Sequence, residues 1–129
     1  MSKSAIICVD DEVVILDSLK KQLKRRFGDR FIYELAESAT EAWLIIEELD
    51  AEGIEIIAIV SDWLMPGMKG DEFLIQIHQS FPKIIKVMLT GQADEVAIER
   101  VQREANLHAC LYKPWTEAEL ERIIATAID

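Results

Sequence analysis

Short apolar runs alternate along the chain with longer amphipathic stretches. The runs are too short for helices and are rich in β-branched residues, which predicts buried strands. They are Ala5–Val9, Phe31–Ala36, Ile56–Val60, Ile84–Leu89 and Ala109–Tyr112. Apolar residues at helical spacing predict five helices between and after these strands. The helices cover Val13–Phe27, Ser38 to Leu49, Asp71–Ser80, Asp94–Glu104 and Thr116 to Ala127.

This strand–helix alternation, repeated five times, predicts an α/β fold with one doubly wound, five-stranded parallel sheet. Continuously apolar strands are typical of a parallel sheet that helices cover on both faces. Right-handed crossovers between parallel strands then place helices on the two sides. Functional residues of such folds lie at the carboxyl ends of the strands, near the point where the strand order reverses.

Polar side chains collect at these predicted strand ends. Asp10 and Asp11 follow the first strand, Asp62 follows the third, Thr90 ends the fourth and Lys113 follows the fifth. Clustered carboxylates repel one another unless a cation neutralises them, and oxygen ligands suit a hard ion such as Mg2+. A carboxylate can also attack phosphorus, which gives an aspartyl phosphate. A lysine and a hydroxyl could then contact the phosphoryl oxygens.

Each of these residues has an ordinary structural interpretation when it is taken alone. An Asp after a strand is often a helix cap, a Thr often ends a strand, and a Lys before Pro is often solvated. The combination favours a site, because all five residues fall on one edge of a fold that was predicted without them.

Composition limits the class of protein further. The 129 residues suit one domain, and 24 acidic against 14 basic residues give a formal charge of -10. Such a chain is a poor candidate for direct nucleic-acid binding, which needs a positive surface. No apolar run approaches the ~20 residues of a membrane span. Two unpatterned cysteines form no disulfide framework, so we expect a cytoplasmic protein.

The residues at the strand ends resemble the receiver domain of two-component response regulators, which has the flavodoxin-like (βα)5 fold. The resemblance covers essentially the whole chain. It rests on VDDE with Asp10 and Asp11, SDWLMPGMKG with Asp62, MLTG with Thr90 and YKPW with Lys113. We therefore expect residues 1–129 to form one receiver domain, either stand-alone or cut from a longer regulator.

The resemblance implies a role for each of these residues. Asp62 would be the phosphoacceptor, Thr90 the switch hydroxyl and Lys113 the phosphate-binding lysine. Asp11, Asp62 and the Leu64 main-chain carbonyl would bind Mg2+ directly, and Asp10 would act mainly through metal-bound water. The Lys113–Pro114 bond would be cis.

It also implies the partners. A sensor histidine kinase or a phosphotransfer protein would supply the phosphoryl group. The fourth helix, fifth strand and fifth helix would form the output surface, used for homodimerisation or for docking a partner. The segment after Thr90 resembles a subgroup that feeds cyclic-dinucleotide phosphodiesterase or transcriptional outputs.

Three positions depart from the commoner receiver pattern. Cys110 stands three residues before Lys113, where many receivers carry an aromatic switch residue. Leu64 and Gln92 each stand two residues after a functional residue, at positions that flank the path of the attacking water in the family. Both therefore bear on the lifetime of the phosphoryl group.

Two other functions compete with the signalling switch. A Mg2+-dependent phosphohydrolase with an aspartyl nucleophile usually needs an acid/base aspartate two residues after the nucleophile, where this chain has Leu64. A degenerate receiver that only binds proteins would not need intact Asp10, Asp11, Asp62, Thr90 and Lys113. We therefore expect a switch and not a turnover enzyme.

Overall fold

Five parallel strands form one sheet in the computed structural model, which describes residues 3–91 and 95–128. The strands are β1 (Ser4–Val9), β2 (Phe31–Ala36), β3 (Ile56–Asp62), β4 (Ile85–Thr90) and β5 (Ala109–Tyr112). They lie in the order β2-β1-β3-β4-β5, so the order reverses at the β1–β3 pair. The doubly wound parallel sheet predicted from the sequence is confirmed.

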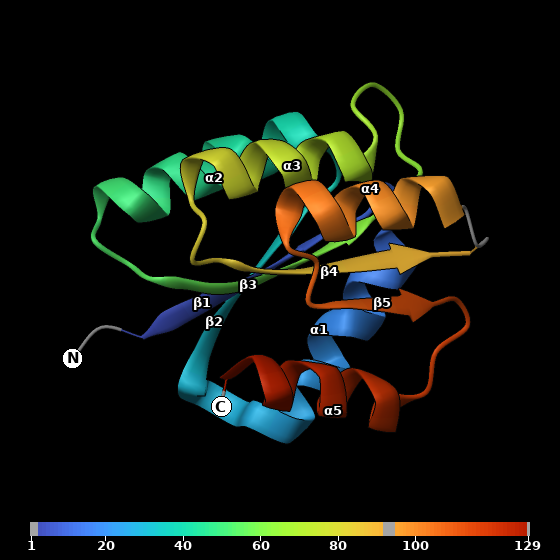
Figure 1. Cartoon of the computed structure of the whole chain (residues 1–129). Coiled ribbons are helices and arrows are strands. Elements are labelled where there is room, and N and C mark those ends of the chain that lie inside the picture. The colour runs from blue at the N-terminus through green and yellow to red at the C-terminus, as the bar shows by residue number, and fades with distance from the viewer. Residues whose placement is uncertain (1–2, 92–94, 129) are drawn as a thin grey trace.

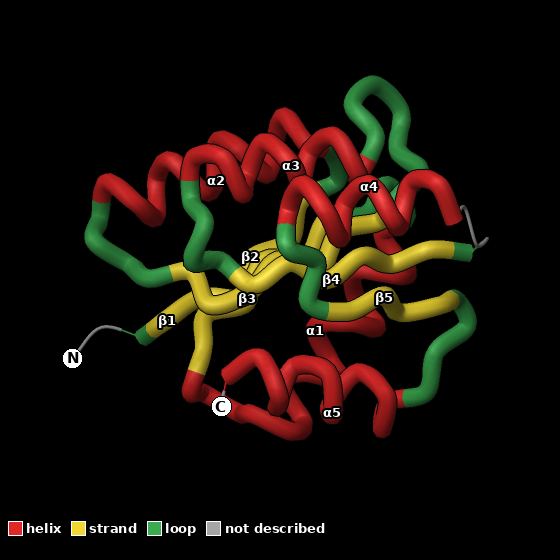
Figure 2. The backbone as a smooth tube through the Cα atoms, viewed as in Figure 1, coloured by secondary structure: helices red, strands yellow, loops and turns green. Residues whose placement is uncertain are grey.

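Helices cover both faces of the sheet (Figures 1 and 2). They are α1 (Val13–Phe27), α2 (Ala39–Ala51), α3 (Gly70–Ser80), α4 (Glu95–Ala105) and α5 (Glu117–Ile128), with a short 3-10 helix η1 (Gly28–Arg30) after α1. α2, α3 and α4 lie on one face, and α1 and α5 lie on the other. The predicted start of α4 at Asp94 lies outside the described residues. No described helix is long and apolar enough to cross a bilayer.

The alternation of side chains along each strand builds the two halves of the core. In β1, Ile7 and Val9 face the α2–α3–α4 layer, whereas Ile6 and Cys8 face the α1–α5 layer. Successive side chains of a strand point to opposite faces, so a strand covered on both sides is apolar at every position. This explains why β1 and β3 were recognisable as uninterrupted apolar runs.

Three strands differ at their ends from the sequence prediction, and β1 begins one residue earlier, at Ser4. β3 continues to Asp62, because Asp62 pairs with Leu89 in the register of β4 and Trp63 N donates to Leu89 O at 2.8 Å. β4 begins one residue later than predicted, because the Ile84 N–H bonds to Phe81 O within the preceding turn. The phosphoacceptor candidate is therefore held by the sheet itself.

Side-chain hydrogen bonds join α1 to the segment after β5. Trp115 Nε1 donates to Gln22 Oε1 at 2.7 Å, and Arg25 forms a bidentate pair with Glu117 at 2.6 and 3.0 Å. Thr116 and Glu119 form a capping box at the start of α5. The loop between Lys113 and α5 is thus fixed to α1.

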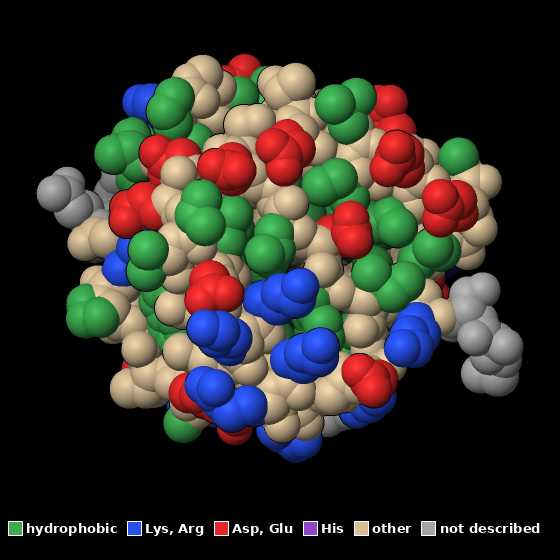
Figure 3. All heavy atoms as spheres, turned by 180° about the vertical axis from the view of Figure 1, so that it is seen from behind, with side chains coloured by type: hydrophobic (Ala, Val, Ile, Leu, Met, Phe, Trp, Pro, Cys, Tyr) green, Lys and Arg blue, Asp and Glu red, His purple; other side chains and the backbone are tan. Residues whose placement is uncertain are grey.

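Basic side chains gather on one part of this acidic molecule. Seen from behind, most of those in view lie in the lower half, the side of the sheet on which α1 lies (Figure 3). The last turn of α1 alone carries Lys24, Arg25 and Arg26. Cations at this end of a helix are favoured by the helix dipole.

A lysine is buried within β4, where the sequence pattern gave no sign of a special role. Lys86 is 1% exposed, and its Nζ lies 2.7 Å from His78 Nδ1 and donates to Pro82 O at 3.1 Å. Burial lowers the pKa of Lys86 to about 8. Burial and the neighbouring Lys86 charge also lower the pKa of His78, which favours the neutral imidazole that can accept this bond.

Lys86→Met is expected to stabilise the fold at neutral pH by about 1–3 kcal/mol, because it removes a desolvated charge. The folded-state pKa of Lys86 lies below its unfolded value, so the unfolded chain binds more protons between the two. The wild-type free energy of unfolding should therefore rise relative to Lys86→Met by about 2 kcal/mol between about pH 7.5 and about pH 10.

Urea unfolding of the two proteins across this pH range measures the difference. The exposed Lys83→Met variant is the matched control and should follow the wild type. A difference between Lys86→Met and the wild type that does not change with pH would contradict the assignment.

Candidate functional site

The carboxyl ends of β1 and β3 bring three aspartates together. Asp10 and Asp11 follow β1, and Asp62 is the last residue of the neighbouring β3. These strands form the pair at which the strand order reverses, so no helix crossover covers the edge between their ends. The structure therefore brings Asp10, Asp11 and Asp62 to one place, as the strand pattern predicted.

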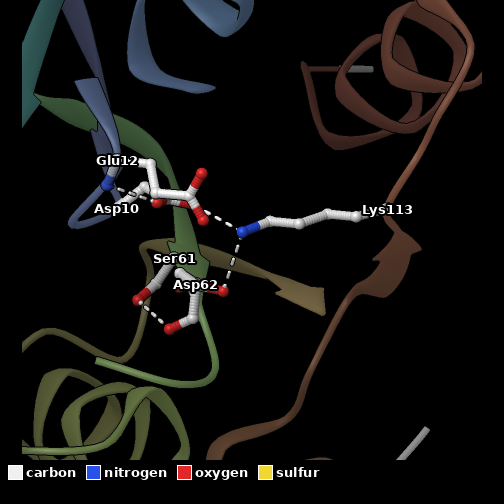
Figure 4. A network of polar contacts seen from close by, with 5 residues as sticks. All are labelled: Asp10, Glu12, Ser61, Asp62 and Lys113. Atoms are coloured by element: carbon white, nitrogen blue, oxygen red, sulfur yellow. Dashed lines mark hydrogen bonds and ion pairs between the residues drawn. The ribbon is translucent and has the colours of Figure 1, made fainter. Parts of the chain in front are cut away.

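Asp10 is fully buried, and both of its carboxylate oxygens are bonded. Oδ1 accepts from the Glu12 N–H at 2.8 Å, and Oδ2 accepts from Lys113 Nζ at 2.9 Å (Figure 4). The first bond closes a turn at the start of α1, which is the structural role expected of an Asp after a strand. The second bond brings the ammonium group from the far side of the cleft.

Lys113 reaches across the cleft from the loop after β5 and ends between two carboxylates (Figure 4). Its Nζ also donates to Asp62 Oδ1 at 3.3 Å. The Lys113 N–H bonds to Thr90 O at 2.8 Å, so the ends of β4 and β5 fix the base of this side chain. The Lys113–Pro114 bond is cis, as the resemblance implied.

These contacts oppose one another in their effect on the ionisation of the site. Burial raises the pKa of Asp62, and the Asp10 carboxylate raises it further, while Lys113 acts in the other direction. Burial alone would lower the pKa of Lys113, but its bonds to Asp10 and Asp62 together raise it above the usual value. The lysine is thus held charged, and Asp62 is a more basic carboxylate than an exposed aspartate.

A cleft of about 680 Å³ opens over Asp62. It is lined by Asp11, Glu12, Asp62, Trp63, Leu64, Met65, Pro66, Gly91 and Lys113. Asp11 is exposed in this cleft, whereas Asp10 and Asp62 are buried. A ligand in the cleft could therefore contact Asp11, Asp62 and Lys113 together.

The three aspartates have the geometry and chemistry of a cation site. One carboxylate oxygen of each lies within 4.8 Å of the others. Three carboxylates against one lysine leave excess negative charge, and oxygen donors suit Mg2+ rather than a softer metal. Leu64, whose carbonyl the sequence analysis assigned to the metal, lines the same cleft. The residues present thus fit a hard divalent cation.

Three further residues from the sequence analysis occupy the surroundings of the cleft. Thr90 is fully buried at the end of β4, beside Gly91 of the cleft wall. Cys110 is partly buried in β5 and packs against the α2–α3–α4 half of the core. Gln92, which the sequence analysis linked to phosphoryl lifetime, lies outside the described residues.

Sequence reasoning did not single out Gly70, the first residue of α3. A Cβ atom there would overlap the Asp62 carbonyl oxygen and lie 2.8 Å from Trp63 Cα. The Gly70 N–H also donates to Trp63 O at 2.8 Å. Only a glycine permits this close approach of the two backbones. The one sequence feature that could have pointed to Gly70 is its position shortly after the Met-Pro-Gly turn.

Comparison with known proteins decides the family. The sequence profile of the response regulator receiver domain matches residues 6–125. The chain belongs to this family. Receivers are phosphorylation-controlled signalling switches in two-component systems, so the general function predicted from the motifs is confirmed at that level.

Curated relatives of this receiver are much longer proteins. The hydrogenase transcriptional regulatory protein HoxA of Cupriavidus necator is 25% identical over 127 residues, which are 98% of this chain and 24% of that protein. The sensor kinase CckA of Brucella abortus is 25% identical over 128 residues, which are 99% of this chain and 13% of that protein. The chain thus spans a quarter or less of the length of these relatives.

Solved structures share the fold over nearly the whole chain. The signal receiver domain of an HD domain-containing protein from Pseudomonas fluorescens has a TM-score of 0.85 and 29% identity, over 98% of this chain and 95% of that one. A CheY-like receiver domain protein from Methanospirillum hungatei has a TM-score of 0.83 and 28% identity, over the same shares of the two chains. The flavodoxin-like fold expected from the resemblance is confirmed.

Proposed function

We propose that Asp62 of this receiver accepts a phosphoryl group in a Mg2+-dependent reaction and that the modified site changes an output surface. The observation that carries the proposal is the position of Lys113 Nζ between the Asp10 and Asp62 carboxylates, with Asp11 beside them in an open cleft. This arrangement supplies a nucleophile, a fixed cation and carboxylates for a metal.

In the proposed reaction, a carboxylate oxygen of Asp62 attacks the phosphorus of a phosphohistidine. The new O–P bond forms as the P–N bond breaks, and the imidazole nitrogen leaves with the electron pair. Lys113 is positioned to pair with a phosphoryl oxygen as a compact point charge. Desolvation of Asp62 makes its carboxylate a stronger base and nucleophile than an exposed one.

Asp11, Asp62 and the Leu64 carbonyl would hold Mg2+, with Asp10 acting mainly through metal-bound water. The bonds of Asp10 to Lys113 and to Glu12 N support this indirect role, because both of its oxygens are already engaged. A bound Mg2+ would offset the charge of the transferring phosphoryl group.

The output would pass through Thr90 and α4. The Thr90 hydroxyl and the Lys113 ammonium would both approach the phosphoryl oxygens, which draws the segment after β4 inward. Cys110 is too small for the aromatic rotation of many receivers, so the signal would pass mainly through α4. The α4–β5–α5 surface would then control a homodimer, a partner or an output domain.

The proposed donor is a sensor histidine kinase or a phosphotransfer protein. Membership of the two-component family supports this class of partner. Direct nucleic-acid binding by this receiver is not proposed, because its formal charge is -10.

Incubation with a small-molecule phosphodonor and Mg2+ tests the proposed function. The switch predicts one acid-stable, alkali-labile phosphoryl group for each chain. Continuous turnover of the donor would instead support a phosphohydrolase, and the absence of any adduct would support a receiver that only binds proteins.

Loss of the phosphoryl group from Asp62 is expected to be slow for this family and to become several-fold faster in Leu64→Asn. Leu64 is 64% exposed at the mouth of the cleft, and its apolar side chain cannot orient an attacking water. An amide there could do so. The decay of the adduct over time, followed by intact mass, measures this rate.

Leu64→Met is the control, because it keeps an apolar side chain of similar size and should decay at the wild-type rate. Slower decay in Leu64→Asn than in the wild type would contradict this account of Leu64.

A further inference from the structure

The first residue of α3 touches the phosphoacceptor segment through its backbone. Gly70 approaches Asp62 O and Trp63 Cα so closely that no side chain fits between them, and it bonds to Trp63 O. A shift of the Asp62–Trp63 backbone therefore has to move the first turn of α3 or break this contact.

The next residue of α3 carries a buried carboxylate that faces α4. Asp71 is 7% exposed, and its Oδ2 lies 3.5 Å from Arg100 Nη1. Arg100 also donates from Nε to Glu104 Oε2 at 3.1 Å, one turn later on its own helix. Among the ion pairs of the described residues, Asp71–Arg100 is the one that joins α3 to α4.

The apolar attachment of α4 is small by comparison with that of α3. The buried residues of α4 are Ala97, Val101 and Ala105, and Val96 is 78% exposed. The buried side chains of α3 include Phe73, Leu74 and Ile77. α4 lies beside α3 over the end of β4 in both ribbon views (Figures 1 and 2). The Asp71–Arg100 pair is therefore a polar contact that adds to this small apolar attachment of α4.

We propose that the Asp71–Arg100 pair holds α4 in its unphosphorylated position and that phosphorylation has to weaken this pair to move the helix. The inference rests on the proposed function, in which the segment after β4 moves inward. The first turn of α3 connects the two sites, because Gly70 contacts Asp62 and the next residue, Asp71, pairs with Arg100 of α4. Asp71 and Arg100 are thus positioning residues for the output helix, without contact to the phosphoryl group.

Linkage gives the sign of the expected effect. A ligand that favours the displaced position of α4 works against every contact that holds the original position. Removing such a contact must therefore tighten the binding of that ligand by the same factor by which the ligand weakened the contact. If the pair served only stability, its removal would lower the resistance to urea and leave the apparent affinity for the ligand unchanged.

The probe is beryllofluoride with Mg2+, a mimic of the phosphoryl group, titrated against the full chain and followed by tryptophan fluorescence. Arg100→Gln should bind the mimic about three- to tenfold more tightly than the wild type. Asp71→Asn should shift the affinity in the same direction. Arg100→Lys keeps the positive charge that Arg100→Gln removes, so its affinity for the mimic should be closer to the wild-type value.

Arg103→Gln is the matched control, because it removes the same charge from an exposed position on the same helix. Hydrogen exchange of residues 95–105 without the mimic should be faster in Arg100→Gln than in Arg103→Gln. Equal affinities of these two variants would overturn the proposal, as would weaker binding in Arg100→Gln. If the wild type itself shows no saturable, Mg2+-dependent binding of the mimic, the proposed function fails and the inference fails with it.

Discussion

Asp62→Asn is expected to abolish phosphoryl acceptance completely. The amide keeps the shape of the side chain but is not a nucleophile, and Asp62 ends the strand beneath the cleft, within reach of Lys113. Intact mass after incubation with a phosphodonor and Mg2+ should show one added phosphoryl group on the wild type and none on the variant.

Asp17→Asn is the control for this experiment. It makes the same chemical change at an exposed aspartate on α1, where the side chain pairs with Lys21, and it should be labelled like the wild type. Labelling of Asp62→Asn equal to that of the wild type would show that Asp62 is not the acceptor. Two phosphoryl groups on the wild type would show a second acceptor residue.

Asp11→Ala is expected to weaken Mg2+ binding by about tenfold or more, and by more than Asp10→Ala does. Asp11 is the exposed aspartate of the three and lines the cleft, so its carboxylate is free to bond a metal directly. Asp10 is already bonded to Lys113 and Glu12, so solvent can partly replace its role at the metal. Calorimetric titration with Mg2+ measures the three affinities.

Glu12→Ala provides the matched control, because it removes another carboxylate from the wall of the same cleft. Its Mg2+ affinity should stay close to that of the wild type. An unchanged affinity in Asp11→Ala would contradict direct ligation by Asp11.

The sheet and its functional edge could be predicted because both depend on patterns that are local in sequence. A strand covered on both faces contains a continuous apolar run, as β3 does from Ile56 to Val60, and such a run stands out from the amphipathic helices. The carboxyl ends of parallel strands meet at one edge whatever the strand order. Asp10, Asp62 and Lys113 could therefore be grouped before the order β2-β1-β3-β4-β5 was known.

The contacts that the sequence did not reveal depend on how the helices pack. Lys86 interrupts the apolar run of β4, and its buried Nζ contacts His78 in the last turn of α3. Asp71 and Arg100 are 29 residues apart in the chain and lie on different helices, and no spacing rule connects two such positions. The role of Gly70 likewise needs the distance to the backbone of β3, which a sequence does not contain.

Lys113 and Asp62, whose charges meet in the cleft, are attached to helices on opposite sides of the sheet. Lys113 leads into the segment that Gln22 and Arg25 attach to α1, whereas Asp62 touches α3 through Gly70. The distance between the Lys113 ammonium and the Asp62 carboxylate therefore depends on the relative position of the layers that contain α1 and α3. In the proposed function, a phosphoryl group on Asp62 would lie between this carboxylate and Lys113. It would then act as a spacer between groups attached to opposite helical layers, and a change in local charge would become a displacement between these layers.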